Sequence, residues 1–185
     1  FLFIVISFLF ISVSLLAEPT LEEVVVSARK VDESVQDVPI AMSVFTASDI
    51  DDAGIERPED FIALTPNVVM ANTVNVGDTL VTIRGLTSTR DAESNFAFVV
   101  DGVLQTNPNA FNRELLDIAQ IEVLKGPQGA LYGRNATSGA ILITTKAPSE
   151  ESESTAVVGM GINNSSKLQY VNSGMMGDNV YTRFS

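Results

Sequence analysis

Glycines gather in one stretch of this chain, 121–146 (IEVLKGPQGALYGRNATSGAILITTK), where they could serve phosphate binding. Glycine-rich loops bind phosphate through backbone N–H groups, and two spacings are typical of them. A Walker loop needs G-x-x-x-x-G-K-[ST], with its lysine after the glycines, whereas here Lys125 precedes them and Gly133 is followed by Arg134. The dinucleotide spacing G-x-G-x-x-G is also absent. The stretch therefore does not predict a nucleotide site.

Composition excludes several other kinds of chemistry. The chain has 185 residues and no cysteine or histidine, so disulfides, thiolate metal sites and histidine ligands are ruled out, as are histidine-dependent catalytic steps. Acidic residues number 23 against 11 basic ones, for a net charge of −12, and the longest basic run is Arg29-Lys30. A nucleic-acid surface needs clustered basic residues. We expect no enzyme, no cofactor, no metal site and no nucleic-acid partner, and we interpret the acidity as a source of solubility.

The two ends of the glycine-rich stretch alternate as strands do. Ile121 and Val123 point one way and Glu122 and Leu124 the other, and residues 141–144 repeat the pattern. A period of two predicts half-buried strands. The glycines between them predict a tightly folded backbone with neighbouring chain packed close.

Further strands and short helices are expected on both sides of this stretch. The strands are predicted by alternation and by strand propensity, and the helices by a Thr-x-x-Asp cap, a first-turn proline and closing turn residues. The expected strands are 40–45, 79–84 and 96–100, with a turn at Asp101-Gly102, and the expected helices are 46–54, 58–64 and 113–118. Interleaved strands and short helices predict an α+β domain.

The segment LKGPQGALYGRNATSGAI resembles the signature of the plug domain of TonB-dependent outer-membrane transporters. In that family a small folded plug blocks the lumen of a large β-barrel. The resemblance implies that residues 34–149 are an α+β plug domain, a small mixed sheet with short helices. It makes the triplet Asn135-Ala136-Thr137 a chance match to a glycosylation site. The residues that carry the signature are Gly85, Asp101, Gly102, Gly126, Pro127, Gly129, Tyr132, Gly133, Arg134, Asn135 and Gly139.

Residues 1–17 (FLFIVISFLFISVSLLA) carry no charge and are expected to be the apolar core of a secretory signal, cleaved after Ala17. A retained membrane anchor is the alternative. The chain starts at Phe1, and no basic residue precedes the apolar run. We therefore expect the signal to be incomplete.

Residues 18–33 are expected to hold a partner-binding strand and a linker. LEEVVVSA has high strand propensity but no partner strand nearby, so it should stay mobile or add to another protein's sheet. The resemblance implies that it is a TonB box, which pairs with the energising protein TonB, while an ordinary first strand is the alternative. The box would comprise Glu22, Glu23, Val24, Val25, Val26, Ser27 and Ala28.

Residues 150–185 begin with the charged hinge EESES, after which the residue pattern differs from that of the preceding domain. Strands are expected at 155–162, 167–176 and from 180 onward, joined by short turns, with Ala156, Val158, Met160 and Ile162 on one face. Apolar alternation of this kind is typical of transmembrane barrel strands, although a soluble hairpin would look similar. A barrel spans lipid only when it is closed. We therefore expect these residues to be the first antiparallel strands of a truncated transmembrane β-barrel, and the chain to be the front part of a larger transporter.

Two basic residues and three loops complete the expected site. The resemblance implies that Arg84 and Lys125 pair with acidic residues on the inner barrel wall as a plug–barrel latch; two solvated surface charges are the alternative. Lysine lacks the bidentate fork of arginine. Substrate contacts are expected on the loops 71–78, 87–95 and 105–112.

The function that the resemblance implies is energised uptake, with no covalent chemistry. A small-molecule substrate, such as a ferric siderophore, would bind the outer face of the plug in the outer membrane of a Gram-negative bacterium. TonB would pair with the tail in the periplasm and move the plug. A signalling receptor and a freestanding periplasmic plug-like binding module are the alternatives.

Overall fold

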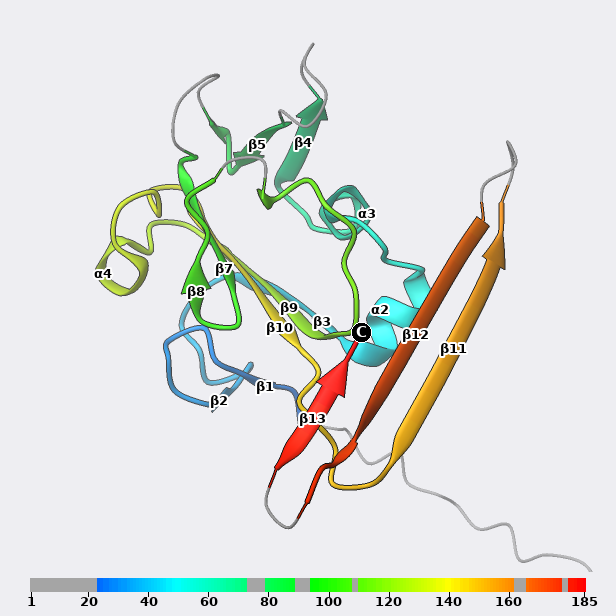
Figure 1. Ribbon diagram of the computed structural model, residues 1–185. Helices are drawn as coiled ribbons and strands as arrows, with labels where there is room; N and C mark the ends of the chain where they lie inside the picture. The colour runs from blue at the N-terminus through cyan, green and yellow to red at the C-terminus, as the bar shows by residue number, and fades with distance from the viewer. Residues whose placement is uncertain (1–22, 73–78, 89–93, 108–109, 162–165, 178–179) are drawn as a thin grey trace, which may run out of the picture.

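A five-stranded mixed sheet forms the centre of the molecule. The computed structural model describes residues 23–72, 79–88, 94–107, 110–161, 166–177 and 180–185. The strands are β3 (Met42–Thr46), β7 (Phe96–Val100), β8 (Val103–Leu104), β9 (Ile118–Lys125) and β10 (Gly139–Thr145), in the order β3-β9-β10-β7-β8. The sheet is mixed because β10 and β7 run parallel, while its other pairs are antiparallel (Figure 1). The expected small mixed sheet is confirmed.

Both faces of the central sheet are covered, so its middle strands are buried on two sides. On one face five phenylalanines meet in four edge-to-face or tilted pairs, with ring centroids 5.0 to 6.3 Å apart, and Ile121 and Val123 pack beneath them. On the other face Leu124 and Leu142 pack against the N-terminal residues Val26 and Ala28. The sequence predicted half-buried strands with these alternating directions; the directions are confirmed, but the burial is complete.

Two short helices follow β3 as the capping signals predicted. Helix α2 (Ala47–Ala53) begins with a capping box in which Thr46 and Asp49 exchange side-chain and backbone hydrogen bonds, and it ends at Gly54 in the left-handed region (φ 63°). The hydroxyl of Thr46, followed by its backbone N–H, lowers the pKa of the Asp49 carboxyl. Helix α3 (Pro58–Ala63) begins at its proline.

The prediction of a helix at 113–118 is wrong. Ile118 instead opens β9, and the preceding backbone bonds to distant segments rather than to its own turn. The N–H of Leu115 donates to the carbonyl of Glu56 (2.8 Å), and the N–H of Lys146 donates to the carbonyl of Asp117 (2.8 Å). Asp117 also has φ 55°, which no right-handed helix accommodates.

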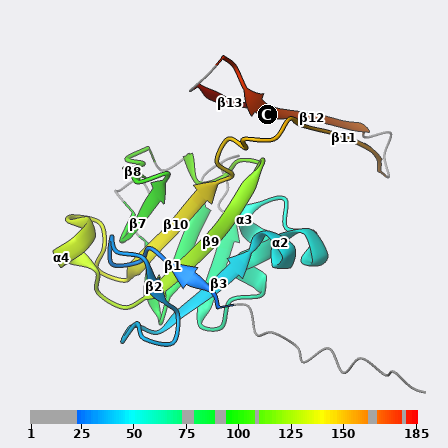
Figure 2. The ribbon, with the colours of Figure 1, turned by 90° about the horizontal axis from the view of Figure 1, so that it is seen from below.

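A two-stranded ladder lies where an unpartnered strand and a linker were expected. Strands β1 (Val25–Val26) and β2 (Glu33–Ser34) pair antiparallel, with Val25 opposite Ser34. The expectation that this valine-rich segment lacks a partner strand is therefore wrong for Val25 and Val26, because the chain returns six residues after β1 as β2 and supplies one. Figure 2 shows this ladder lying against the central sheet.

A second small sheet has the order β4-β5-β6 and is antiparallel throughout. Its strands are β4 (Val68–Asn72), β5 (Thr79–Ile83) and β6 (Leu86–Thr87). Strand β5 matches the expected strand 79–84, and its inward residues Val81 and Ile83 join the phenylalanine-rich core.

The C-terminal sheet consists of β11 (Glu153–Met160), β12 (Ser166–Met175) and β13 (Tyr181–Phe184), all antiparallel, as the sequence predicted. Val158, Met160 and Leu168 project from one face and are 71%, 91% and 79% exposed. The opposite face lies toward α2 and the start of β9. In Figure 2 this sheet forms a separate layer beside the rest of the molecule.

The expected signal, residues 1–17, lies outside the described residues, as does Glu22 of the expected TonB box. No helix in the described part of the chain is both long and apolar enough to cross a membrane.

Candidate functional site

The glycine-rich signature turns the chain from β9 through helix α4 (Gly129–Tyr132) into β10. Gly126 adopts φ 115°, a conformation that other residues avoid, and its N–H donates to the carbonyl of Ser138 (2.9 Å). A Cβ atom at Gly139 would lie 2.2 Å from the carbonyl oxygen of Leu124. The close approach of β9 and β10 therefore requires glycine at this position, as the density of glycines predicted.

The remaining signature residues are spread over several turns and do not converge on one site. Pro127 lies between β9 and α4, Gly129 and Tyr132 lie in α4, and Gly133, Arg134 and Asn135 follow that helix. Gly85 lies in the turn between β5 and β6, and Asp101 and Gly102 form the expected turn between β7 and β8. The carboxylate of Asp101 accepts hydrogen bonds from the N–H and the hydroxyl of Thr145 (2.8 and 3.0 Å). The signature thus specifies the path of the backbone.

The segment Val25–Ala28, called the docked segment below, is fastened to the central sheet. The side-chain amide of Gln120 donates to the carbonyl of Val25 (3.0 Å), and the hydroxyl of Tyr132 donates to the carbonyl of Ala28 (2.7 Å). Val26 is only 1% exposed. The residues expected to bind a partner are therefore held on the molecule itself.

Glu122 is a buried acid beneath the docked segment, and sequence reasoning did not single it out. Its Oε1 atom accepts hydrogen bonds from the N–H of Ser27 (3.1 Å), the hydroxyl of Ser27 (3.4 Å) and the amide of Gln120 (3.4 Å). Its Oε2 atom has no partner among the described residues. Burial raises the pKa of the Glu122 carboxyl, and the hydrogen bonds from Ser27 oppose that shift. The sequence feature that could have indicated this buried acid is a glutamate flanked by two apolar residues, Ile121 and Val123, in a predicted strand.

The structure brings Arg84 and Lys125, the two residues of the expected latch, next to each other. The ammonium of Lys125 donates to the hydroxyl of Ser43 (3.0 Å) and to the carbonyl of Pro66 (3.4 Å). Burial, followed by the charge of Arg84, lowers the pKa of Lys125. Within the described ranges neither cation forms an ion pair with a carboxylate. The latch to an inner barrel wall stays a prediction.

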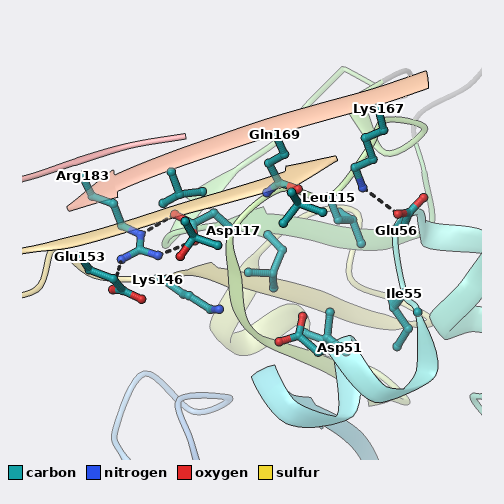
Figure 3. A pocket seen from close by; sticks show the side chains of 16 residues that line it. Asp51, Ile55, Glu56, Leu115, Asp117, Lys146, Glu153, Lys167, Gln169 and Arg183 are labelled. Carbon is teal, nitrogen blue, oxygen red and sulfur yellow. Dashed lines mark hydrogen bonds and ion pairs between the residues drawn. The ribbon is translucent and has the colours of Figure 1, made fainter. Parts of the chain in front are cut away.

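Ion pairs that the sequence did not predict join the C-terminal sheet to the rest of the molecule (Figure 3). Arg183 of β13 makes a two-pronged contact with Asp117, with 2.7 Å between Nη2 and Oδ1, and lies 3.5 Å from Glu153. Lys167 of β12 contacts Glu56 at 2.6 Å. The side chains of Arg183 and Asp117 are only 11% and 7% exposed. The acid is thus on the plug side and the cation on the C-terminal sheet, the reverse of the polarity expected for the latch.

A hollow of about 320 Å³ separates the two parts beside these ion pairs. Ile50, Asp51 and Ile55 line it from the region of α2, and Val157, Gln169 and Val171 line it from the C-terminal sheet (Figure 3). The alternation of β11 and β12 predicted that one face would point outward. It could also have located this inward face, because Lys167, Gln169 and Arg183 fall on it.

The expected substrate loops lie only partly within the described residues. Residues 73–78, 89–93 and 108–109 fall outside them. The described chain contains no cluster of three or more acidic side chains that could hold a metal ion.

Comparison with known proteins places this architecture in a family. The sequence model of the TonB-dependent Receptor Plug Domain matches residues 34–140. The chain is 31% identical over 132 residues to the pesticin receptor of Yersinia enterocolitica, which covers 71% of this chain and 19% of the relative. It is 28% identical over 171 residues to the vitamin B12 transporter BtuB of Vibrio vulnificus, covering 89% of this chain and 27% of that protein.

Solved structures agree with the sequence comparison. The ferric yersiniabactin uptake receptor FyuA from Yersinia pestis matches 77% of this chain and 23% of its own, with a TM-score of 0.71 and 28% identity. The ferripyoverdine receptor of the outer membrane of Pseudomonas aeruginosa matches 86% of this chain and 21% of its own, with a TM-score of 0.74 and 21% identity, and so shares the fold.

A plug-type α+β domain followed by the first antiparallel strands of a barrel is the fold that these features define. The chain belongs to the TonB-dependent receptor plug domain family. It spans about a fifth of the length of the pesticin receptor that it matches.

Proposed function

We propose that the chain is the gating part of a TonB-dependent outer-membrane transporter, in which the plug controls energy-coupled uptake of a scarce small molecule. The observation that carries this proposal is the position of the C-terminal sheet. Its apolar face is exposed, as a lipid-facing wall requires, while its polar face packs against the plug through ion pairs and a hollow. A plug enclosed by a barrel requires barrel strands with an apolar face toward lipid and a polar face toward the plug.

The nature of the proposed substrate follows the relatives. Their names include receptors and transporters for ferric yersiniabactin, ferripyoverdine, ferrichrome and vitamin B12. A ferric siderophore is the proposed cargo, bound at the outer face of the plug. These proteins are named as receptors and transporters rather than enzymes, which supports a role without covalent chemistry.

The proposed partners are TonB and the lipid of the outer membrane. TonB would add a strand to residues 22–28, and the plug with its N-terminal tail would face the periplasm of a Gram-negative cell. The latch of Arg84 and Lys125 to acidic residues of the barrel remains part of this proposal. The proximity of the two cations, with no carboxylate paired to either in the described chain, leaves both able to take such a partner.

The transporter is favoured over a freestanding binding module because of the exposed apolar side chains of β11 and β12. Val158, Met160 and Leu168 are all more than two-thirds exposed. A contiguous apolar face of this kind would promote aggregation of a periplasmic protein, whereas it suits contact with lipid. The same face is compatible with a signalling receptor, which would differ in its readout rather than in its wall.

Proline at position 25 tests the pairing with TonB. Val25→Pro removes one strand N–H donor, so we expect uptake to stop while binding of the same substrate persists. Radioactive iron delivered as ferrichrome, ferripyoverdine or ferric yersiniabactin, together with labelled vitamin B12, would measure both quantities on whole cells. Val25→Ala keeps the donor and is the matched control. Loss of both uptake and binding, or of neither, would contradict the proposed role of the segment.

A further inference from the structure

The docked segment has already used the backbone groups that strand pairing with a partner would need. Val25 and Ala28 accept hydrogen bonds from Gln120 and Tyr132, and the N–H of Ser27 donates to Glu122. Val26 pairs with β2 and is buried. A partner strand needs free donors and acceptors along one edge. The docked segment must therefore leave the plug before it can pair.

The ladder between β1 and β2 is too short to hold the docked segment by itself. It contains only two residue pairs, Val25 with Ser34 and Val26 with Glu33. An isolated two-stranded ladder is marginal in water even when it is longer. Retention therefore depends on contacts between the segment and the central sheet.

Among the residues that make these contacts, Glu122 is the one whose presence in the sheet packing alone does not explain. It lies in the middle of β9, between Val44 of β3 and Leu142 of β10 on the same face, and it is 2% exposed. A buried carboxyl is costly unless it is hydrogen-bonded, and a leucine would fill such a place without that cost. Two of its three hydrogen bonds come from Ser27. The benefit of an acid here thus lies in its contact with the docked segment.

We propose that the carboxyl of Glu122 is the group that retains the docked segment on the plug, so that this segment cannot reach a partner protein until the contact with Ser27 breaks. This inference rests on the proposed function, because it describes how the proposed TonB-binding residues are kept out of reach. Glu122 is a positioning residue in this scheme, acting through Ser27. Gln120 and Tyr132 fix the carbonyls on either side.

The charge state of Glu122 gives this retention a pH dependence with a definite sign. Burial raises the pKa of the carboxyl above its ordinary value of 4.5 while the segment is docked, and departure of the segment admits water and returns the pKa toward that value. Between the two values the docked state holds a proton that the released state gives up. The docked fraction is therefore highest below the ordinary pKa and falls as pH rises through the window above it.

Other charged groups near Glu122 do not reverse that sign. The charge of Asp32, in the turn after β1, also raises the pKa of Glu122. Burial, followed by the charge of Glu122, raises the pKa of Tyr132 to about 12, so the tyrosine keeps its proton throughout the window. The ammonium of Lys30 lies 5.7 Å from the centre of the Tyr132 ring.

Thiol labelling of the intact protein can measure the release directly, because this chain has no cysteine of its own. Val26→Cys places a reporter at a position that is 1% exposed, and Val25→Cys places one at its 49% exposed neighbour. The ratio of their labelling rates by a small maleimide reports the released fraction and cancels the intrinsic pH dependence of the thiol. Adding Glu122→Ala should raise that ratio roughly tenfold or more near neutral pH, because a hydrogen bond to a buried acid is lost. With Glu122 present the ratio should rise as pH is raised above the ordinary pKa of 4.5, and with Glu122→Gln it should be flat.

Two controls separate release from unfolding. Ile141→Cys, in β10 at 0% exposure on the phenylalanine-rich face away from the docked segment, should stay protected in every variant that is folded. Tyr132→Phe removes only the contact with Ala28, and should raise the ratio while leaving its pH dependence in place. If Glu122→Ala also unmasks the reporter in β10, the decision passes to Glu122→Gln. An unchanged ratio in Glu122→Ala, or a pH dependence that survives Glu122→Gln, would overturn the proposal.

The same variants, expressed in cells, distinguish retention by Glu122 from the proposed pairing with TonB. Release of the segment in Glu122→Ala accompanied by stronger disulfide cross-linking of Val25→Cys to a TonB cysteine variant supports both. Release without cross-linking supports retention by Glu122 and counts against pairing with TonB. Cross-linking that is equally strong with and without Glu122 overturns the retention and leaves the pairing intact.

Discussion

The closest backbone approach in the signature is made at a single residue, Gly139. The space for its side chain is occupied by the carbonyl oxygen of Leu124, which is backbone and cannot rotate away. Gly129 belongs to the same signature, yet a Cβ there would have no neighbour within 4 Å. Two glycines of one motif therefore have different physical roles, and substitution separates them.

Gly139→Ala should destabilise the plug by about 1–3 kcal/mol or more, because the methyl group forces β9 and β10 apart. That loss corresponds to roughly a tenfold faster opening for each 1.4 kcal/mol. Hydrogen exchange of the β9 and β10 amides in the intact protein would measure it. Gly129→Ala is the matched control and should leave exchange unchanged or slower, since alanine favours the helix. Equal sensitivity at the two positions would contradict the steric explanation.

Among the elements, α2 links the central sheet to the hollow beside the C-terminal sheet. It follows β3 directly, and its Ile50 packs in the core and, with Asp51, also lines the hollow. Its start is defined by the capping box of Thr46 and Asp49. A helix of two turns depends strongly on its cap, because few internal hydrogen bonds support it.

Thr46→Ala should destabilise the first turn of α2 by about 1 kcal/mol. The hydroxyl of Thr46 lowers the pKa of Asp49, so this contribution is present above the ordinary pKa of 3.8 and is lost as pH falls through the lowered value. Exchange of the α2 amides would follow both effects. Asp52→Ala, an exposed substitution in the same helix, should not change the pH dependence, and a matching change there would refute the role assigned to the cap.

Local signals predicted the elements whose formation depends on neighbouring residues. The cap at Thr46, the turn at Asp101-Gly102 and the alternation of β9 and β10 all specify backbone conformation within a few positions, and all are confirmed. The helix predicted at 113–118 does not form, because the backbone partners of this segment, Glu56 and Lys146, are far away in sequence. The same applies to Ser27 and Glu122, which are 95 residues apart. Contacts of this kind depend on how sheets stack, and periodicity does not report that.

At the scale of the whole molecule, the plug and the C-terminal sheet meet through charges and a hollow rather than through a continuous apolar interface. Lys167 and Glu56 form a partly exposed pair at one place, and Arg183 and Asp117 form a nearly buried pair at another. Removing one partner of a nearly buried pair is costly, because the charge of the other partner is left uncompensated. The contact of Arg183 is therefore the stronger candidate for a fixed point about which a gate could move.

Asp117→Asn keeps the shape of the side chain but removes its charge, leaving the guanidinium of Arg183 with Glu153 at 3.5 Å. We expect a loss of about 1–3 kcal/mol at this contact, smaller than for a fully isolated buried charge because Glu153 remains. Hydrogen exchange of β13 and of the Lys146 amide, which donates to Asp117, should accelerate roughly tenfold for each 1.4 kcal/mol lost.

Glu114→Gln is the control for that experiment, because Glu114 pairs with Arg57 at the surface, where the side chains are 58% and 52% exposed. An exposed pair contributes about 0–1 kcal/mol, so exchange should barely change. Arg84→Ala forms a parallel arm that tests the proposed latch: faster exchange across the plug would support it. If β13 were as protected from exchange in Asp117→Asn as in Glu114→Gln, the pair of Arg183 and Asp117 would not be the fixed point. The C-terminal sheet would then be held to the plug no more firmly beside the hollow than elsewhere in the interface.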